Sequence, residues 1–185
     1  MKTALLMLTA SIFSISNISI TGCANVPPVN KNGDFSRALE SGNFSDSGAI
    51  ALHESGYRFT VILVNNLEWA LESLEIADYG LPHISQFKRG EKVTPFLTFM
   101  TFNNGNVDLT YSVKLQGPDG KSVEEKNNLL IARSRVSESM GYPAQEFAAI
   151  NFDGTAALGT YQFHIIIRDG ENIRNACIMQ FELTE

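Results

Sequence analysis

The chain has 185 residues, a length that favours one globular domain. Hydrophobic residues make up 44% and charged residues 18%, which is typical of a globular protein and excludes a disordered or membrane-embedded chain. The net charge is −6, with 14 basic residues against 20 acidic ones, and the basic residues are scattered. This distribution argues against a nucleic-acid partner, because phosphate binding requires clustered cations.

The N-terminus has the pattern of a secretory signal. Lys2 precedes an apolar stretch over residues 4–20, which is too short and too diluted by Ser and Asn for a membrane span. The stretch ends in Ile-Thr-Gly-Cys at positions 20–23, which resembles the lipobox of bacterial lipoproteins. The resemblance implies that residues 1–22 are a signal peptide and that Cys23 is acylated as the first mature residue. Ordinary signal cleavage after Ala24 and an uncleaved anchor are the alternatives.

The residues after Cys23 suggest the localisation of the protein and a spacer before the domain. Position 24 is Ala rather than Asp, and by the sorting rule of enterobacterial lipoproteins this implies the outer membrane of a Gram-negative bacterium. Acyl chains would hold the protein at the membrane. Residues 23–50 are rich in Asn, Ser, Gly and Pro, so we predict a lipidated, flexible tether, with one helical turn over residues 35–39 as an alternative for that part. The folded domain is then expected over residues 51–185.

The first part of the domain contains two predicted strands. Residues 56–64 alternate between apolar and polar side chains, which indicates a strand. Residues 67–77 match helical spacing only in part, and a short helix across the end of a sandwich is one interpretation. The strand over residues 92–102 is apolar on both faces, so either both faces are covered or one meets a partner.

The central part is divided by turn signals. Asn103-Asn104-Gly105-Asn106 predicts a hairpin, and the strand that follows, residues 107–116, alternates cleanly. Residues 122–132 are expected to form a bent edge strand. A polar loop is predicted over residues 133–143 and another strand over residues 145–152.

The chain closes with a predicted antiparallel hairpin. Apolar side chains alternate along residues 159–168 and 176–183, and Asp169-Gly170 supplies the turn. The Gly-x-Tyr-x-Phe sequence that ends at Phe163 is similar to the tyrosine corner of immunoglobulin-like domains.

This resemblance implies an all-β fold. We expect an antiparallel immunoglobulin-like, or transthyretin-like, sandwich of about seven strands, preceded by the signal peptide and tether. Phe163 stands where an antibody domain has its second core cysteine, and residues 92–102 contain no cysteine. The antibody type is therefore excluded.

Few residues suggest chemistry. Cys177 shares the phase of apolar neighbours, so we predict a buried, inert thiol. No His follows it, which argues against a copper site, and we expect no metal and no cofactor. His164 is expected at the surface without a task. Asp119, Asp153 and Asp169 each precede Gly, which turn geometry explains. Because familiar catalytic motifs are absent, we predict that the chain is not an enzyme.

Two sets of residues suggest binding. Phe96, Met100 and Phe102 form one face of the doubly apolar strand and could contact a protein partner, although cover by residues 67–77, including Trp69, is favoured. We therefore predict a lipid-anchored, non-enzymatic envelope protein that acts by protein–protein binding or as an accessory subunit of an envelope assembly. The alternative is a binder of a glycan or other small ligand, motivated by the aromatic side chains Trp69, Tyr79 and Tyr142.

Overall fold

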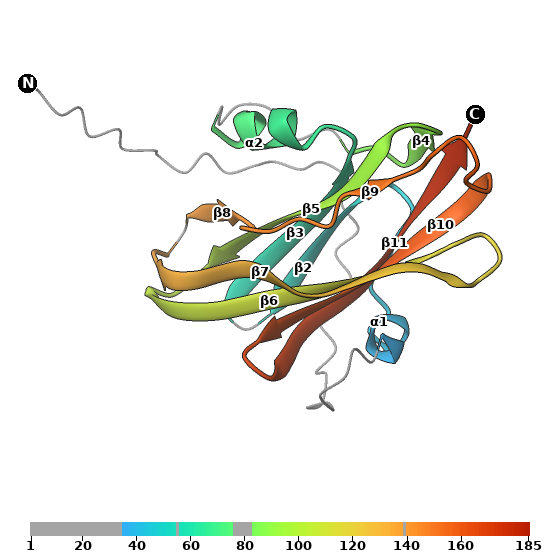
Figure 1. Cartoon of the computed structure of the whole chain (residues 1–185). Helices are drawn as coiled ribbons and strands as arrows, with labels where there is room; N and C mark the ends of the chain where they lie inside the picture. The colour runs from blue at the N-terminus through green and yellow to red at the C-terminus, as the bar shows by residue number, and fades with distance from the viewer. Residues whose placement is uncertain (1–34, 55, 76–82, 139) are drawn as a thin grey trace, which may run out of the picture.

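The computed structural model describes residues 35–54, 56–75, 83–138 and 140–185. The predicted signal peptide, Cys23 and Tyr79 lie outside these ranges. Within them the chain is predominantly β, with two layers of strands and two short helices (Figure 1). In chain order the elements are α1 (Ser36–Glu40), β1 (Phe44–Ser45), β2 (Ala49–Glu54), β3 (Tyr57–Val64), α2 (Leu67–Glu75), β4 (Gln86–Lys88), β5 (Lys92–Thr101), β6 (Gly105–Gln116), β7 (Ser122–Val136), β8 (Gly141–Pro143), β9 (Ile150–Asn151), β10 (Gly159–Asp169) and β11 (Asn172–Thr184).

The strands form two sheets. The six-stranded sheet has the order β1-β11-β10-β6-β7, and β4 also pairs with β11. The five-stranded sheet has the order β2-β3-β5-β8, and β9 also pairs with β5. Pairing is antiparallel except where β1 and β4 run parallel to β11. Side chains from both sheets, such as Phe59, Leu97 and Phe163, are fully buried in one shared core, so the sheets pack face to face as a β-sandwich.

The closing hairpin confirms its alternating pattern. β10 and β11 pair from Gly159 with Leu183 to Asp169 with Asn172. Phe163 of β10 and Phe181 of β11 stack in the core with their ring centroids 5.4 Å apart. Cys177 is also fully buried, as predicted. Because both strands repeat apolar residues every second position, one face of the hairpin builds the core.

Several predictions about the connections were wrong. The expected Asn103–Asn106 hairpin is a crossover instead, because β5 and β6 belong to different sheets. The predicted loop over residues 133–143 contains the end of β7 and all of β8. The predicted strand over residues 145–152 is reduced to β9, with eleven strands in the described ranges rather than about seven. Alternation of apolar and polar residues indicates that a strand buries one face, but it does not indicate which sheet the strand joins.

The predicted tether is too long. Residues 35–50 were expected to be flexible, yet they form α1, β1 and the start of β2. We call residues 35–45 the strap. Phe35 and Ala38 are 6% and 1% exposed and pack against the outer face of the six-stranded sheet. The Asn43 carbonyl accepts a hydrogen bond from the Ile178 amide at 2.8 Å, so the strap also covers the edge of β11.

On the opposite outer side, α2 covers the five-stranded sheet (Figure 1). Residues 67–77, for which a short helix was one interpretation, contain α2, which ends at Glu75. Ala70 is fully buried against Phe96, and the ring of Phe96 stacks on Phe147 at 5.3 Å. The doubly apolar strand is thus covered by α2 at its first half, as the favoured interpretation had it.

Candidate functional site

One end of the sandwich brings together connections from both sheets. The Phe102 amide donates to the Gly56 carbonyl at 3.0 Å, which joins the β5–β6 connection to the start of β3. The Glu138 amide donates to the Asn104 side chain at 3.0 Å, which joins the same connection to the segment after β7. The Gly170 amide at the β10–β11 turn donates to the Asp108 carbonyl at 3.0 Å. We call this end the loop end.

The loop end carries two exposed apolar side chains. Phe102 is 49% exposed and Met140 is 48% exposed. Phe102 follows the last residue of β5, and Met140 precedes the first residue of β8, both just beyond the pair of Met100 with Gly141. Met140 was missed by the sequence analysis, since one Met in a polar loop gives no signal that separates contact from gap filling.

Tyr142 connects the loop end to the hydrophobic core. Its ring is half-buried and stacks on Phe99 of the core with centroids 5.3 Å apart. Its hydroxyl accepts a hydrogen bond from the Ser137 amide at 3.0 Å and donates to the Met140 sulfur at 3.7 Å. Tyr142 therefore positions the segment that contains Met140, because its ring packs on the core and its hydroxyl bonds to two residues of that segment.

Charged pairs surround the apolar side chains. Arg133 pairs with Asp108 at 2.9 Å, and Arg174 pairs with Asp169 at 3.0 Å. Burial raises the pKa of the Tyr57 hydroxyl, and the nearby Asp169 carboxylate raises it further. The loop end thus carries two exposed apolar side chains and two ion pairs.

The sequence-predicted partner residues are separated by the fold. Phe96 is fully buried under α2 and is corrected as a partner-binding residue, because it has no surface to offer. Met100 is half-buried, and only Phe102 is exposed. Of the proposed ligand-binding residues, Trp69 is 41% exposed on α2, whereas Tyr142 packs on the core from β8.

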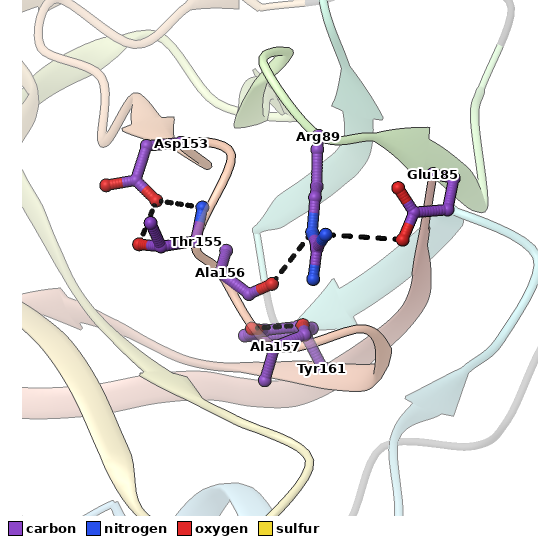
Figure 2. Close-up of polar contacts among 7 residues, drawn as sticks. All are labelled: Arg89, Asp153, Thr155, Ala156, Ala157, Tyr161 and Glu185. Carbon is purple, nitrogen blue, oxygen red and sulfur yellow. Dashed lines mark hydrogen bonds and ion pairs between the residues drawn. The ribbon is translucent and has the colours of Figure 1, made fainter.

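The other end of the sandwich is closed by polar contacts (Figure 2). Arg89 donates to the Ala156 carbonyl at 2.9 Å and pairs with the Glu185 carboxylate at 3.2 Å. The Thr155 hydroxyl and amide both donate to the Asp153 carboxylate, which lowers the pKa of that carboxyl group. These groups fix the loop between β9 and β10, as turn chemistry predicted for Asp153.

Two side chains of types that can take part in catalysis, a thiol and an imidazole, are buried in the six-stranded sheet. Burial raises the pKa of the Cys177 thiol to about 12, which keeps it protonated and unreactive. His164 was predicted at the surface, but it is only 4% exposed. Its Nε2 lies 3.1 Å from the Gln116 side-chain oxygen, and burial followed by the Lys114 charge lowers the pKa of its imidazole. The prediction failed because the outer face of this sheet is partly covered.

The described ranges offer little for metal or membrane. No three His, Cys, Asp or Glu side chains among them gather in a way that could hold a metal ion. No helix in the same ranges has the length and apolar character needed to cross a membrane.

No known protein family matches the sequence, and no curated protein matches it either. Solved structures give weak likenesses. A Niemann-Pick type C2 protein from Japanese carpenter ant has 5% identity and a TM-score of 0.43, covering 74% of this chain and 98% of that chain. An alkylpurine DNA glycosylase from Pseudomonas fluorescens has 13% identity and a TM-score of 0.36, covering 55% and 28%. A family 123 glycoside hydrolase from Clostridium perfringens has 11% identity and a TM-score of 0.39, covering 68% and 27%.

These comparisons correct one prediction. The chain was predicted not to be an enzyme, but two of the three similar structures named above are enzymes. This chain spans only 28% and 27% of their lengths. At such TM-scores the likenesses assign no reaction and no catalytic residue to this chain, and catalysis is left neither assigned nor excluded.

Proposed function

We propose that this chain is a lipid-anchored envelope protein whose sandwich binds another envelope protein through the loop end. The observation that carries the proposal is the exposure of Phe102 and Met140, at 49% and 48%, on one end of a two-sheet domain. Exposed large apolar side chains favour a protein contact, because removing apolar surface from water lowers the free energy.

The finer fold assignment is an immunoglobulin-like sandwich. Two observations support it. The order β3-β5-β9 in one sheet and β7-β6-β10-β11 in the other follows the immunoglobulin orders A-B-E and C′-C-F-G, with β2 as an added edge. The Tyr161 hydroxyl donates to the Ala157 carbonyl at 2.8 Å, four residues upstream, which is the hydrogen bond of a tyrosine corner. Binding through end loops is a recurring use of this architecture.

The anchor is proposed from the lipobox resemblance of residues 20–23. Only 11 residues lie between Cys23 and Phe35, where the strap begins, so an acylated Cys23 would hold the domain within about 40 Å of the bilayer. Ala24 favours the outer membrane. Growth with labelled palmitate tests this assignment: label is expected on the native chain and absent from a Cys23→Ser variant. Label on neither chain would contradict acylation at Cys23.

Binding is tested by cross-linking in intact host cells followed by identification of captured proteins. We expect one envelope protein to be captured repeatedly, and capture to be lost in Phe102→Ser and in Met140→Ser. Val123→Ser is the matched control, because Val123 is 56% exposed and adjoins Gly117 beyond the opposite end of β6. Equal loss in all three variants, or unchanged capture in the first two, would contradict the loop end as the contact surface.

Ligand binding is the second candidate, and Trp69 is the observation that favours it. Trp69 is the only Trp of the chain, and it is 41% exposed on α2. An exposed indole can stack on a sugar ring. A glycan that binds there should shift the fluorescence of Trp69 in proportion to occupancy. No shift across a broad glycan panel would remove this candidate and leave the loop-end proposal intact.

A further inference from the structure

The strap is a separate piece that is held on the six-stranded sheet by few contacts. Its helix α1 has five residues and its strand β1 has two. Isolated helices shorter than about 12 residues are not stable in water, so α1 depends on the surface beneath it. Phe35 and Ala38 supply the buried apolar contacts of the strap.

The polar contacts of the strap are specific to one stretch of β11. The side-chain amide nitrogen of Asn43 donates to the Ala176 carbonyl at 2.9 Å and to the side-chain oxygen of Asn175 at 3.2 Å. The Ile178 amide donates to the Asn43 carbonyl at 2.8 Å. Asn43 and Asn175 are 7% and 6% exposed, so these bonds are made away from water. A strap that leaves therefore uncovers polar groups on a strand edge that need new partners.

An apolar face is uncovered at the same time. Under the strap lie the side chains of Ile166, Ile173, Ala176 and Ile178, each 8% exposed or less. An open strand edge beside an apolar face is a surface that pairs with other chains. The segment that fits it best is an identical strap, because a second copy restores every contact that the first strap made.

The connection to the rest of the domain permits such an exchange. Asp46 and Ser47 are exposed and link β1 to β2. Gly48, which follows, is fixed: its φ is +80°, its carbonyl accepts the Leu63 amide at 2.7 Å, and a Cβ there would overlap the Ile84 backbone. The Ser45 and Ser47 hydroxyls donate to the Ala49 carbonyl at 2.7 and 3.4 Å, so an exchange breaks these two bonds and turns the chain at Asp46 and Ser47, next to the fixed Gly48.

We propose that residues 35–45 exchange between two copies of this chain, so that the strap of each copy lies on the β11 edge of the other. The pairing is reciprocal and uses the contacts already present within one copy. The inference concerns the strap face, and it stands whether or not the loop end binds a partner.

Engineered cysteines test the exchange directly. Phe44 and Ile178 are register partners in the β1–β11 pair. Adjacent strands lie about 4.8 Å apart, within the roughly 4.4–6.8 Å between Cα atoms that a disulfide spans. One copy carries Phe44→Cys, another carries Ile178→Cys, and both are co-expressed in the host and oxidised. A covalent dimer of the two copies is expected. The native Cys177 is buried and does not compete.

Two controls define the result. A copy that carries both substitutions shows the yield of the disulfide within one chain. Val123→Cys, at a 56% exposed position outside the strap, paired with Ile178→Cys on another copy, reports random collision. A mixed dimer no more abundant than the Val123→Cys product, with the intrachain disulfide formed in the doubly substituted copy, would overturn the exchange.

A second measurement does not depend on disulfide geometry. Copies with two different C-terminal tags are co-expressed and purified from membranes in detergent through one tag. The second tag is expected to follow in the native protein and in Leu39→Asp, and to be lost in Ala38→Asp, because Ala38 is the strap residue buried against the sheet and Leu39 is exposed. Absence of hybrids in the native protein, or equal recovery in both variants, would overturn the proposal.

Discussion

The β10–β11 hairpin and the strap use the same sheet in opposite ways. The hairpin packs its inner face, which includes Phe163, into the core. Its register extends over eleven pairs from Gly159 to Asp169. The strap lies on the other face and pairs with β11 at two positions. The comparison teaches that one sheet can hold a segment that belongs to the global fold and another that opens separately.

The largest expected effect is on the hairpin. Phe163→Ala removes a fully buried ring that stacks on Phe181, so we expect a loss of about 3–5 kcal/mol in the free energy of unfolding. Denaturant melts followed by far-UV circular dichroism measure it. A loss below about 1 kcal/mol would mean that the core relaxes around the cavity and that the hairpin is not the centre of the fold.

The next effect lies at the fixed point beside the strap. Gly48→Ala places a Cβ against the Ile84 backbone at a φ of +80°, so we expect a loss of about 2–3 kcal/mol. Gly42→Ala is the control, because Gly42 has a φ of +69° but open space around it, and about 1 kcal/mol is expected. Equal losses in melts of the two variants would show that backbone conformation alone, without the close approach, sets the effect.

A smaller effect is expected for the strap. Phe35 is nearly as buried as Phe163, yet Phe35→Ala should reduce the free energy of global unfolding by only about 1–2 kcal/mol. The reason is that the loss cannot exceed the docking free energy of the strap, which is small after the entropy of ordering its residues is subtracted. A loss as large as that of Phe163→Ala would contradict separate opening.

The smallest effect depends on pH. His164 pairs with Ile178 in the register beneath the strap, and Lys114 and Gln116 of β6 face it. Its pKa is lowered in the folded state by burial and then by Lys114, so the unfolded chain binds the proton more readily. Stability from this group is complete above about pH 6.5 and decreases as the pH falls below that value. In denaturant melts, His164→Gln should reduce the change in the free energy of unfolding between neutral and mildly acidic pH. An unchanged pH dependence would contradict this role.

The contrast also shows what the sequence could predict. The hairpin and the burial of Cys177 followed from spacing, because periodicity is a local property of neighbouring residues, whereas the spacing over residues 67–77 left a helix as only one interpretation. A helical turn at residues 35–39 was one interpretation of the sequence, but the docking of the strap was not predicted, since the face that receives Phe35 and Ala38 is more than 100 residues away. The crossover after Phe102 failed for a related reason: a turn signal does not state which sheet receives the next strand.

The candidate site was predictable only in part. Phe102 was identified because it continued an apolar strand, but the same pattern included Phe96, which α2 covers. Met140 became visible only when the pairing of Gly141 with Met100 placed it beside β5. Exposure is a property of the packed structure, and a strand with two apolar faces does not report where its cover ends.

Native-state hydrogen exchange tests most directly that the strap is held separately from the hairpin. The Ile178 amide donates to the strap carbonyl of Asn43, whereas the Glu182 amide of the same strand donates to the Ser85 carbonyl outside the strap. In the native chain we expect Ile178 to exchange through a smaller opening that does not depend on denaturant, and Ala38→Asp to speed its exchange without changing the amides that join β10 to β11. Exchange of Ile178 only through global unfolding, in step with the hairpin amides, would contradict the separation.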